Sequence, residues 1–262
     1  MSETVEEITV SQSDGIAIIS LNRPHAKNAM SISANKKLFE IWEEVDSDKS
    51  ISVIILTSSD CGCFCAGMDL KDSKRIQEES GKDILEVLKD PFYERMRSVT
   101  KPLIVAMTGD FFGAGILLAM NSDIRIGMAG TFGGISEAKY GRGTPWATPL
   151  LFMLPLGINL EMILTAATVP IDRLYQLGFV NHIEADPDSV RARAMSLAET
   201  IAGNAPLSVT IGKKGIMDAM ELVDKTGRAH SKSLHTKVYS SEDAKEGPIA
   251  FAQRRQPRWK GV

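Results

Sequence analysis

The order of apolar and polar residues predicts that the chain starts with a β-hairpin and continues into a helix. Residues 4–10 and 15–22 have the length and composition of strands, and Ser13-Asp14-Gly15 between them suits a tight turn. Beyond Pro24 the apolar residues recur at helical spacing; they are Leu38, Ile41, Trp42 and Val45.

Farther along, buried strands alternate with helices. Residues 51–58 and 101–107 are apolar, β-branched runs typical of strands covered on both faces. Between them, a polar stretch at about 71–99 has helical character and is broken near Pro91. After these come a helix and two short strands, and most of the chain beyond Pro145 is predicted to be helical; the helix and strands are expected at 113–122, 123–129 and 131–136.

This alternation favours an α/β fold with stacked βαβ units in the first two thirds of the chain. The last third, from about Asp186, is rich in amphipathic helix and has few strand signals. We therefore expect a core at 1–185 and a helical C-terminal region at 186–262. No repeat of fixed period and no clear linker divides the sequence.

Composition limits the possible functions. Of the 262 residues, 44% are apolar and 24% are charged, and the net charge of -3 gives no reason to expect nucleic acid as a partner. The first ten residues lack the basic and apolar parts of a signal peptide. No apolar run reaches the roughly 20 residues that cross a membrane. These features predict a cytoplasmic protein that does not bind a membrane.

All three cysteines lie in one segment, "CGCFCAGMDL" at 61–70. Their Cys-x-Cys-x-Cys spacing does not match a zinc site, and the four histidines provide no second half of one. Alternate residues of a strand share a face, so Cys61, Cys63 and Cys65 would form a ridge of thiols. We interpret the ridge as packing and expect no metal; a redox role is the weaker alternative.

Two glycine turns carry more chemical information than the thiols. In "FCAGMD" (64–69) and again in "GDFFGAG" (109–115), a strand turns on glycine and enters a helix. Such turns leave backbone N–H groups without partners inside the helix. Held by adjacent strands, two of them could converge on one developing oxyanion. The glycines do not fit a dinucleotide fingerprint, because Leu118 occupies its third glycine position.

Together these motifs resemble the crotonase (enoyl-CoA hydratase/isomerase) superfamily over nearly the whole chain. The resemblance implies a spiral of ββα units, followed by a helical C-terminal region that drives assembly into a homotrimer, often stacked as a hexamer. It implies an acyl-CoA thioester as substrate and no cofactor, since coenzyme A is part of the substrate. The matching segments occur in family order and are "ISLNRPHAKNAMS", "FCAGMDL", "KPLIVAMTGDFFGAGILLAMNSDIRI", "TFGGISEAKYG", "LGFVNHI" and "EDAKEGPIAFAQRRQPRWKG".

The resemblance places an oxyanion hole at the backbone N–H groups of Met68 and Ala114. Ala114 stands at the middle position of what is commonly a Gly-Gly-Gly triplet, and it keeps the N–H donor. Other positions are carried over as walls around the coenzyme A part of the substrate and the two turns; they are Ala26, Lys27, Ala66, Gly67, Leu70 and Gly113.

The carboxylates depart from the family pattern. Family hydratases usually carry two glutamates, but here the first position is Leu117 and only the second, Glu137, is acidic. Adding water across a conjugated double bond requires one group to activate the water and another to supply a proton. A single carboxylate can still move a proton from one carbon to another, which is double-bond isomerisation. The family also includes isomerases, lyases and hydratases without the first glutamate.

The loop after Glu137 is a second departure, because it reads "GRGTPWATPLL" where many relatives have "GAGG". Arg142 could pair with Glu137 or bind a substrate carboxylate, and Trp146 could stack on an aromatic or cyclic acyl group. Packing or a subunit contact explains either residue equally well. The basic C-terminus is either solvated or near the coenzyme A phosphates; its candidate contacts are Arg254, Arg255, Arg258 and Lys260.

The sequence thus predicts an acyl-CoA enzyme with an oxyanion-stabilised enolate and Glu137 as its single acid–base group, either an isomerase or an atypical hydratase. Two alternatives stay open. The chain could bind acyl-CoA with little catalysis, or it could be a C–C hydrolase or lyase of the same superfamily. The acyl group, its length, and the choice between trimer and hexamer are not predicted.

Overall fold

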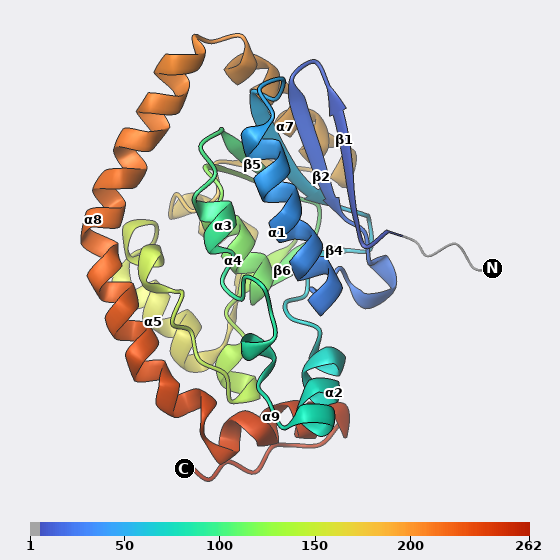
Figure 1. Ribbon diagram of the computed structural model, residues 1–262, viewed down its shortest axis with the longest axis vertical. Helices are drawn as coiled ribbons and strands as arrows, with labels where there is room; N and C mark the ends of the chain where they lie inside the picture. The colour runs from blue at the N-terminus through green and yellow to red at the C-terminus, as the bar shows by residue number, and fades with distance from the viewer. Residues whose placement is uncertain (1–5) are drawn as a thin grey trace, which may run out of the picture.

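The predicted hairpin forms one edge of a six-stranded sheet in the computed structural model, which describes residues 6–262 (Figure 1). Within this sheet only the hairpin is antiparallel, and its other described strands pair in parallel with their neighbours. Two residues of the predicted first strand, 4 and 5, lie outside the described residues. In sheet order the strands are β1 (Ile8–Ser13), β2 (Ile16–Leu21), β3 (Val53–Ser58), β5 (Leu103–Met107), β7 (Ile124–Met128) and β10 (His182–Glu184).

A smaller sheet of four short strands lies beside the first. Its strands, in order, are β4 (Cys63–Cys65), β6 (Asp110–Phe112), β8 (Phe132–Gly134) and β9 (Thr168–Pro170). Three times in succession the chain passes from a strand of the larger sheet to a strand of the smaller one, as β3–β4, β5–β6 and β7–β8. The first two pairs are each followed by a helix. This is the predicted spiral of ββα units.

Helices cover the sheets and make up most of the last third (Figure 1). The α-helices are α1 (Ile32–Ser47), α2 (Leu70–Ser80), α3 (Glu94–Arg97), α4 (Ala114–Met120), α5 (Leu156–Thr165), α6 (Ile171–Gln176), α7 (Pro187–Ala202), α8 (Pro206–Tyr239) and α9 (Glu242–Ala252). The 3₁₀ helices are η1 (Pro24–Ala26), η2 (Ile84–Glu86), η3 (Glu137–Tyr140) and η4 (Thr148–Phe152). In residues 6–262, no helix is both long and apolar enough to cross a membrane.

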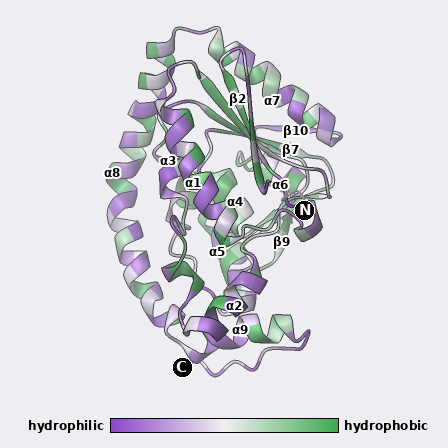
Figure 2. Cartoon of the chain, turned by 45° about the vertical axis from the view of Figure 1, so that its right-hand side comes forward, coloured by the Kyte–Doolittle hydropathy of each residue, from purple (hydrophilic) through white to green (hydrophobic). Residues whose placement is uncertain are grey.

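The larger sheet separates two apolar layers. Ile54 and Leu56 of β3 pack in the main core with Leu38 and Trp42 of α1. The alternate residues of the same strand face α7, which contributes small side chains such as Ala194. Because β3 is buried along its whole length, it needs the continuous apolar run that the sequence shows. In Figure 2, the strands beside β2 show green, hydrophobic positions.

The structure refines two expectations about secondary structure. The polar stretch at 71–99 is broken near Pro91 as expected, but it is also broken earlier: α2 ends before Gly81, whose φ of 70° is left-handed, and Asp83 then caps η2. Glycine and a capping carboxylate are standard helix boundaries. Most of the chain beyond Pro145 is helical, as expected. The sequence did not reveal β9 and β10 between these helices, because three-residue strands are too short to show a period of two.

The C-terminal region returns to the core of its own chain. α8 runs along one side of the molecule, and α9 turns back across α2 and η3 (Figure 1). This contact is backbone against backbone, since a Cβ at Gly247 of α9 would overlap the carbonyl group of Tyr140. α9 therefore closes over the segment that carries Glu137.

Candidate active site

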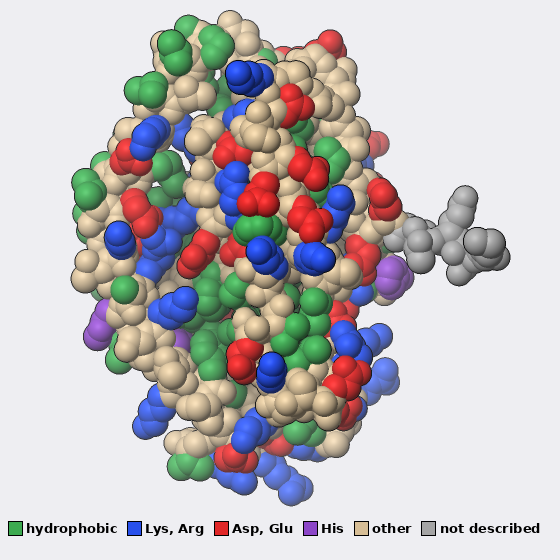
Figure 3. Space-filling view, in the orientation of Figure 1, with side chains coloured by type: hydrophobic (Ala, Val, Ile, Leu, Met, Phe, Trp, Pro, Cys, Tyr) green, Lys and Arg blue, Asp and Glu red, His purple; other side chains and the backbone are tan. Residues whose placement is uncertain are grey.

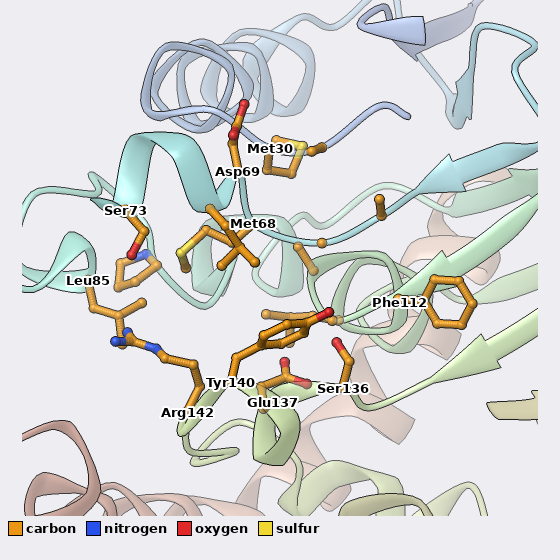
Figure 4. A pocket seen from close by; sticks show the side chains of 18 of the residues that line it. Met30, Met68, Asp69, Ser73, Leu85, Phe112, Ser136, Glu137, Tyr140 and Arg142 are labelled. Carbon is orange, nitrogen blue, oxygen red and sulfur yellow. The ribbon is translucent and has the colours of Figure 1, made fainter. Parts of the chain in front are cut away.

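A cavity of about 490 Å³ brings together the predicted catalytic residues and all the predicted substrate-binding residues except those of the basic C-terminus, and Figure 4 shows part of its lining. Its walls come from η1, the turns before α2 and α4, η3 with the loop that follows it, and the C-terminal helices. The predicted residues that line it are Ala26, Lys27, Ala66, Gly67, Met68, Leu70, Gly113, Ala114, Glu137, Arg142 and Trp146.

The two glycine turns meet inside this cavity. A Cβ placed on Gly67 would lie 3.8 Å from the amide nitrogen of Ala114 and 3.3 Å from the carbonyl oxygen of Phe112. Gly67 has a φ of 106° and Gly113 a φ of 51°. Glycine adopts these left-handed conformations without the strain that a side chain would add. The sequence expectation that the turns are neighbours therefore agrees with the geometry.

Each turn offers an N–H group that has no backbone partner among the described residues. At the first turn, the N–H of Met30 donates to Gly67 at 2.8 Å, and the carbonyl of Met30 accepts from Asp69 at 2.9 Å. Neither hydrogen bond uses the N–H of Met68, the residue between Gly67 and Asp69. At the second turn, Ala114 is the first residue of α4, and Gly113 supplies no side-chain cap. The first amides of a helix have no partner inside it.

Glu137 opens η3 directly opposite the second turn. A Cβ placed on Gly113 would lie 3.5 Å from Glu137 Oε1 and 3.9 Å from Ser136 Oγ. Oε2 of Glu137 is buried and has no hydrogen-bond partner among the described residues. Burial raises the pKa of Glu137 to about 7, against the opposing effects of nearby backbone amides and of Arg142. Its carboxyl group can therefore take up or release a proton near neutral pH.

No second carboxyl group faces Glu137 in the described part of the cavity. Leu117, at the position where family hydratases have a glutamate, is 3% exposed and belongs to the apolar core. The other acidic residue in the lining, Asp69, caps α2 through the N–H of Lys71 at 3.0 Å and pairs with Arg23 at 2.9 Å. The carboxyl group of Asp69 is thus committed to the start of α2.

The suggested pairing of Arg142 with Glu137 was wrong. The guanidinium group of Arg142 instead makes two contacts with the carboxylate of Asp83, one of them 2.7 Å long. Burial acts to raise the pKa of the Asp83 carboxyl group, but hydrogen bonding to Arg142 outweighs burial and lowers that pKa below its usual value. The guanidinium also lies 4.9 Å from the ring centre of Tyr239. Figure 4 shows it extending toward Leu85 and away from Glu137.

Sequence reasoning missed three tyrosines that line the cavity: Tyr93, Tyr140 and Tyr239. Tyr140 had a usable signal, because residues three apart in a 3₁₀ helix share a face, and Glu137 and Tyr140 are three apart in η3. Tyr93 and Tyr239 come from distant segments that meet only in the folded chain. Asp83, the partner of Arg142, was missed for the same reason.

The basic C-terminus folds back along α9. Arg255 pairs with Glu246 at 2.9 Å, and the backbone N–H of Arg258 donates to the same carboxylate at 2.7 Å. Phe251 of α9 lines the cavity, whereas the four basic residues proposed from the tail are not part of its described lining. In this chain the tail thus buttresses α9.

The cysteine thiols are free and largely inaccessible. Cys63 and Cys65 are buried in β4, and Cys61 precedes the strand at a partly exposed position. Burial raises the pKa of both Cys63 and Cys65 to about 12, which makes them poor nucleophiles at neutral pH. Their place in the core fits the packing interpretation.

Comparison with known proteins gives the site its context. The sequence model of a family described as enoyl-CoA hydratase/isomerase matches residues 11–262. An enoyl-CoA hydratase of Mycobacterium tuberculosis is 32% identical over 92% of each chain. (E)-Benzylidenesuccinyl-CoA hydratase of Thauera aromatica is 30% identical over 97% of this chain and 99% of its own. Among solved structures, carnitinyl-CoA hydratase from Mycobacterium avium superposes with a TM-score of 0.85 at 28% identity, covering 99% of this chain and 100% of its own.

Proposed function

The chain belongs to the enoyl-CoA hydratase/isomerase family, and from this premise we propose that it isomerises the double bond of an enoyl-CoA thioester. The base, Glu137, removes a proton from the carbon next to the thioester carbonyl, and the electron pair moves onto the carbonyl oxygen. The same carboxyl group returns the proton to a carbon farther along as the double bond shifts. The number of protons on the substrate is unchanged.

The proposed oxyanion hole consists of the N–H groups of Met68 and Ala114. Their turns are in contact, and neither N–H is used within its own element, so both can donate to an enolate oxygen placed between them. Preorganised donors of this kind stabilise charge where it develops, and one of them is worth roughly 2.7–4 kcal/mol. Glu137, whose carboxyl group lies next to Gly113, is then within reach of the substrate carbon beside the thioester carbonyl.

The observation that carries isomerisation is the lone, buried carboxyl of Glu137. With Leu117 at the other position, the lining provides one acid–base carboxyl in an apolar setting. One such group suffices for moving a proton between two carbons, whereas hydration needs water to be oriented and activated as well.

Hydration is the second candidate, and one feature favours it. Ser136 and Tyr140 line the cavity on either side of Glu137 in sequence, and their hydroxyl groups could hold a water molecule for it. Figure 4 shows both side chains at the Glu137 end of the cavity. The two relatives and the solved structure described above are all hydratases by name.

The test is Glu137→Gln assayed on 2-enoyl-CoA and 3-enoyl-CoA, with product mass read by mass spectrometry. We expect interconversion without change of mass in the natural protein and a loss of about 10²–10⁴-fold in the variant. A gain of water would favour hydration, and cleavage would favour a hydrolase or lyase. Tight binding of acyl-CoA without turnover would favour a binding protein. Unchanged activity in Glu137→Gln would remove this residue from the mechanism.

We propose that the coenzyme A part of the substrate lies toward α2 and α9. The lining there includes Lys27 and Lys71, whose charges suit phosphate groups, and Phe251 from α9. Figure 3 shows Lys and Arg side chains gathered around the end of the molecule where α2 and α9 lie. Ala26, Ala66 and the glycine turns leave the narrow space that a pantetheine arm needs.

We also propose that the chain assembles as a trimer, with or without stacking into a hexamer. Large apolar side chains of η4, α5 and α8 are exposed in the single chain, and Figure 2 shows hydrophobic positions spread along α8. Surfaces of this kind are typical of interfaces between subunits. Sedimentation equilibrium should give a multiple of three chain masses, and a monomer would contradict the proposal. The exposed residues are Leu151, Phe152, Leu156, Leu160, Leu164, Leu207, Ile211, Ile216, Leu222, Val223 and Leu234.

A further inference from the structure

Aromatic side chains are concentrated around the cavity. The chain has nine Phe, three Trp and four Tyr, and seven of these sixteen residues are among the 30 that line it. Three of the four tyrosines are included, although the cavity lining makes up only about one ninth of the chain. The aromatic residues come from several segments far apart in sequence, so chain proximity does not explain their gathering.

Part of this aromatic lining lies beyond the oxyanion turns, where the acyl group would extend. Leu117 is three residues after Ala114 and so lies on the same face of α4, one turn farther in. Leu117, Phe92 and Trp146 also line a second cavity of about 40 Å³, which places the three side chains next to one another. Tyr93 adjoins Phe92 and is 4% exposed. The acyl end of the cavity is thus walled by rings.

Hydrogen bonds and core packing hold the segments that carry these rings. The amide group of Asn121 donates to the backbone carbonyl of Tyr93 at 3.3 Å, which ties this segment to the end of α4. The Tyr239 hydroxyl donates to the carbonyl of Gly143 at 3.0 Å. Trp146 is 7% exposed and belongs to the apolar core. Aromatic side chains rotate about only two bonds, so fixed rings form a slot whose shape exists before a ligand enters.

The ion pair of Arg142 and Asp83 closes the cavity wall beside η2. Arg142 lines the cavity and reaches across to Asp83, which precedes the cavity-lining residues Leu85 and Leu88. Both charges are largely buried, with side-chain exposures of 10% and 20%. A long apolar acyl chain that extended to this wall would have to separate the pair and leave two charges without partners, which is costly.

We infer that, given the proposed action on enoyl-CoA, the acyl group is a short unsaturated chain that ends in an aromatic ring. A ring gains offset or edge-to-face contacts with surrounding rings in addition to burial of its area. A linear aliphatic chain would bind no more tightly between rings than between leucine or methionine side chains.

The experiment compares the affinities of 3-phenylpropanoyl-CoA and nonanoyl-CoA, which have equal numbers of acyl carbons, by calorimetry on the full-length protein. We expect the phenyl compound to bind at least roughly 5-fold more tightly. Nonanoyl is the more apolar group, so burial alone predicts the opposite order. Equal affinities, or tighter binding of nonanoyl-CoA, would overturn the inference.

These saturated thioesters are neither hydrated nor isomerised, so the comparison is independent of the reaction. Turnover of a short aliphatic 3-enoyl-CoA tests the proposed function separately. If that substrate reacts while nonanoyl-CoA binds as tightly as the phenyl compound, the aromatic preference fails and the proposed function stands.

Variants identify which residues produce the preference. Trp146→Leu should reduce the affinity ratio roughly 2- to 10-fold, since it removes one ring and keeps an apolar side chain. Phe92→Leu provides an independent measurement should the first variant not fold. Tyr175→Leu is the matched control, because Tyr175 lies on α6, is 50% exposed and is not in the lining. A ratio that persists in both cavity variants would contradict the inference.

Discussion

The two turns that meet in the cavity are similar in sequence but are supported differently. The first leads into α2, where only Ser73 is buried and where the carboxylate of Asp69 caps the helix. The second leads into α4, which has no side-chain cap and buries every residue from Gly115 to Met120. One turn borders solvent, while the other is held by the core.

The difference shows how one rigid element can position two donors. α4 presses directly on β4, since a Cβ at Gly115 would lie 2.6 Å from the carbonyl oxygen of Cys65. β4 leads straight into the first turn, so the buried helix also fixes its exposed neighbour. Arg125 secures the other end of α4 by donating to the carbonyl of Ala119 in its last turn at 3.3 Å and to that of Ser122 just beyond it at 2.7 Å. Cations are favourable at a helix C-terminus.

The largest effect should come from removing the donor of the rigid turn. Ala114→Pro deletes one N–H group at the first position of α4, where proline is tolerated. We expect kcat to fall about 10²–10³-fold with a normal circular dichroism spectrum. Met68→Ala, which keeps the N–H of the other turn, is the control and should lose less than about 10-fold. A folded Ala114→Pro protein with the original kcat would show that this amide is not an oxyanion donor.

The second-largest effect concerns the ionisation of Glu137, which is buried and faces the second turn. Its pKa is about 7 in the folded protein and near 4.5 in an unfolded chain. Folding therefore favours the protonated form. The contribution of Glu137 to stability is complete below about pH 4.5, declines as the pH rises, and is lost above about pH 7. The shift corresponds to about 3 kcal/mol.

Glu137→Gln cannot ionise and should lack this decline. Urea unfolding of both proteins between pH 4.5 and pH 8 measures it: the two should be similar at the acidic end, and the variant should be more stable by up to about 3 kcal/mol at the alkaline end. Parallel curves over the whole range would mean that the carboxyl of Glu137 ionises as readily in the folded protein as in water. The second turn would then border solvent as the first one does.

Most of the helices and strands could be predicted from the sequence because the patterns that specify them are local. A buried parallel strand such as β3 needs an unbroken apolar run, and a turn into a helix needs glycine or a cap. The short strands β9 and β10 were missed because their three residues pair through contacts with β8 and β7 that no local pattern records.

The candidate site divides in the same way. The turn residues and Glu137 belong to contiguous motifs, so the resemblance located them. The partner of Arg142 did not follow, because Asp83 is 59 residues away and only the folded chain brings the two together. The rings that wall the acyl end come from segments equally far apart. The substrate preference of the site therefore depends on long-range contacts, whereas the positions of its catalytic groups depend on local motifs.

The smallest expected effect tests the exposed side of the comparison. Lys71 lies in the first turn of α2 and lines the cavity, so Lys71→Ala should raise KM for acyl-CoA roughly 2- to 5-fold and leave kcat unchanged. The change should vanish near 1 M salt, because charges at the surface are then screened. Lys74→Ala is the matched control: Lys74 is on the same helix, pairs with Glu78 at 3.6 Å and is not in the lining. Steady-state kinetics of both variants at two salt concentrations measures these changes.

Two outcomes would contradict the expectation. An equal rise of KM in both variants would mean that α2 attracts the substrate by its overall charge. A fall in kcat for Lys71→Ala would mean that the exposed helix takes part in positioning the donor of Met68.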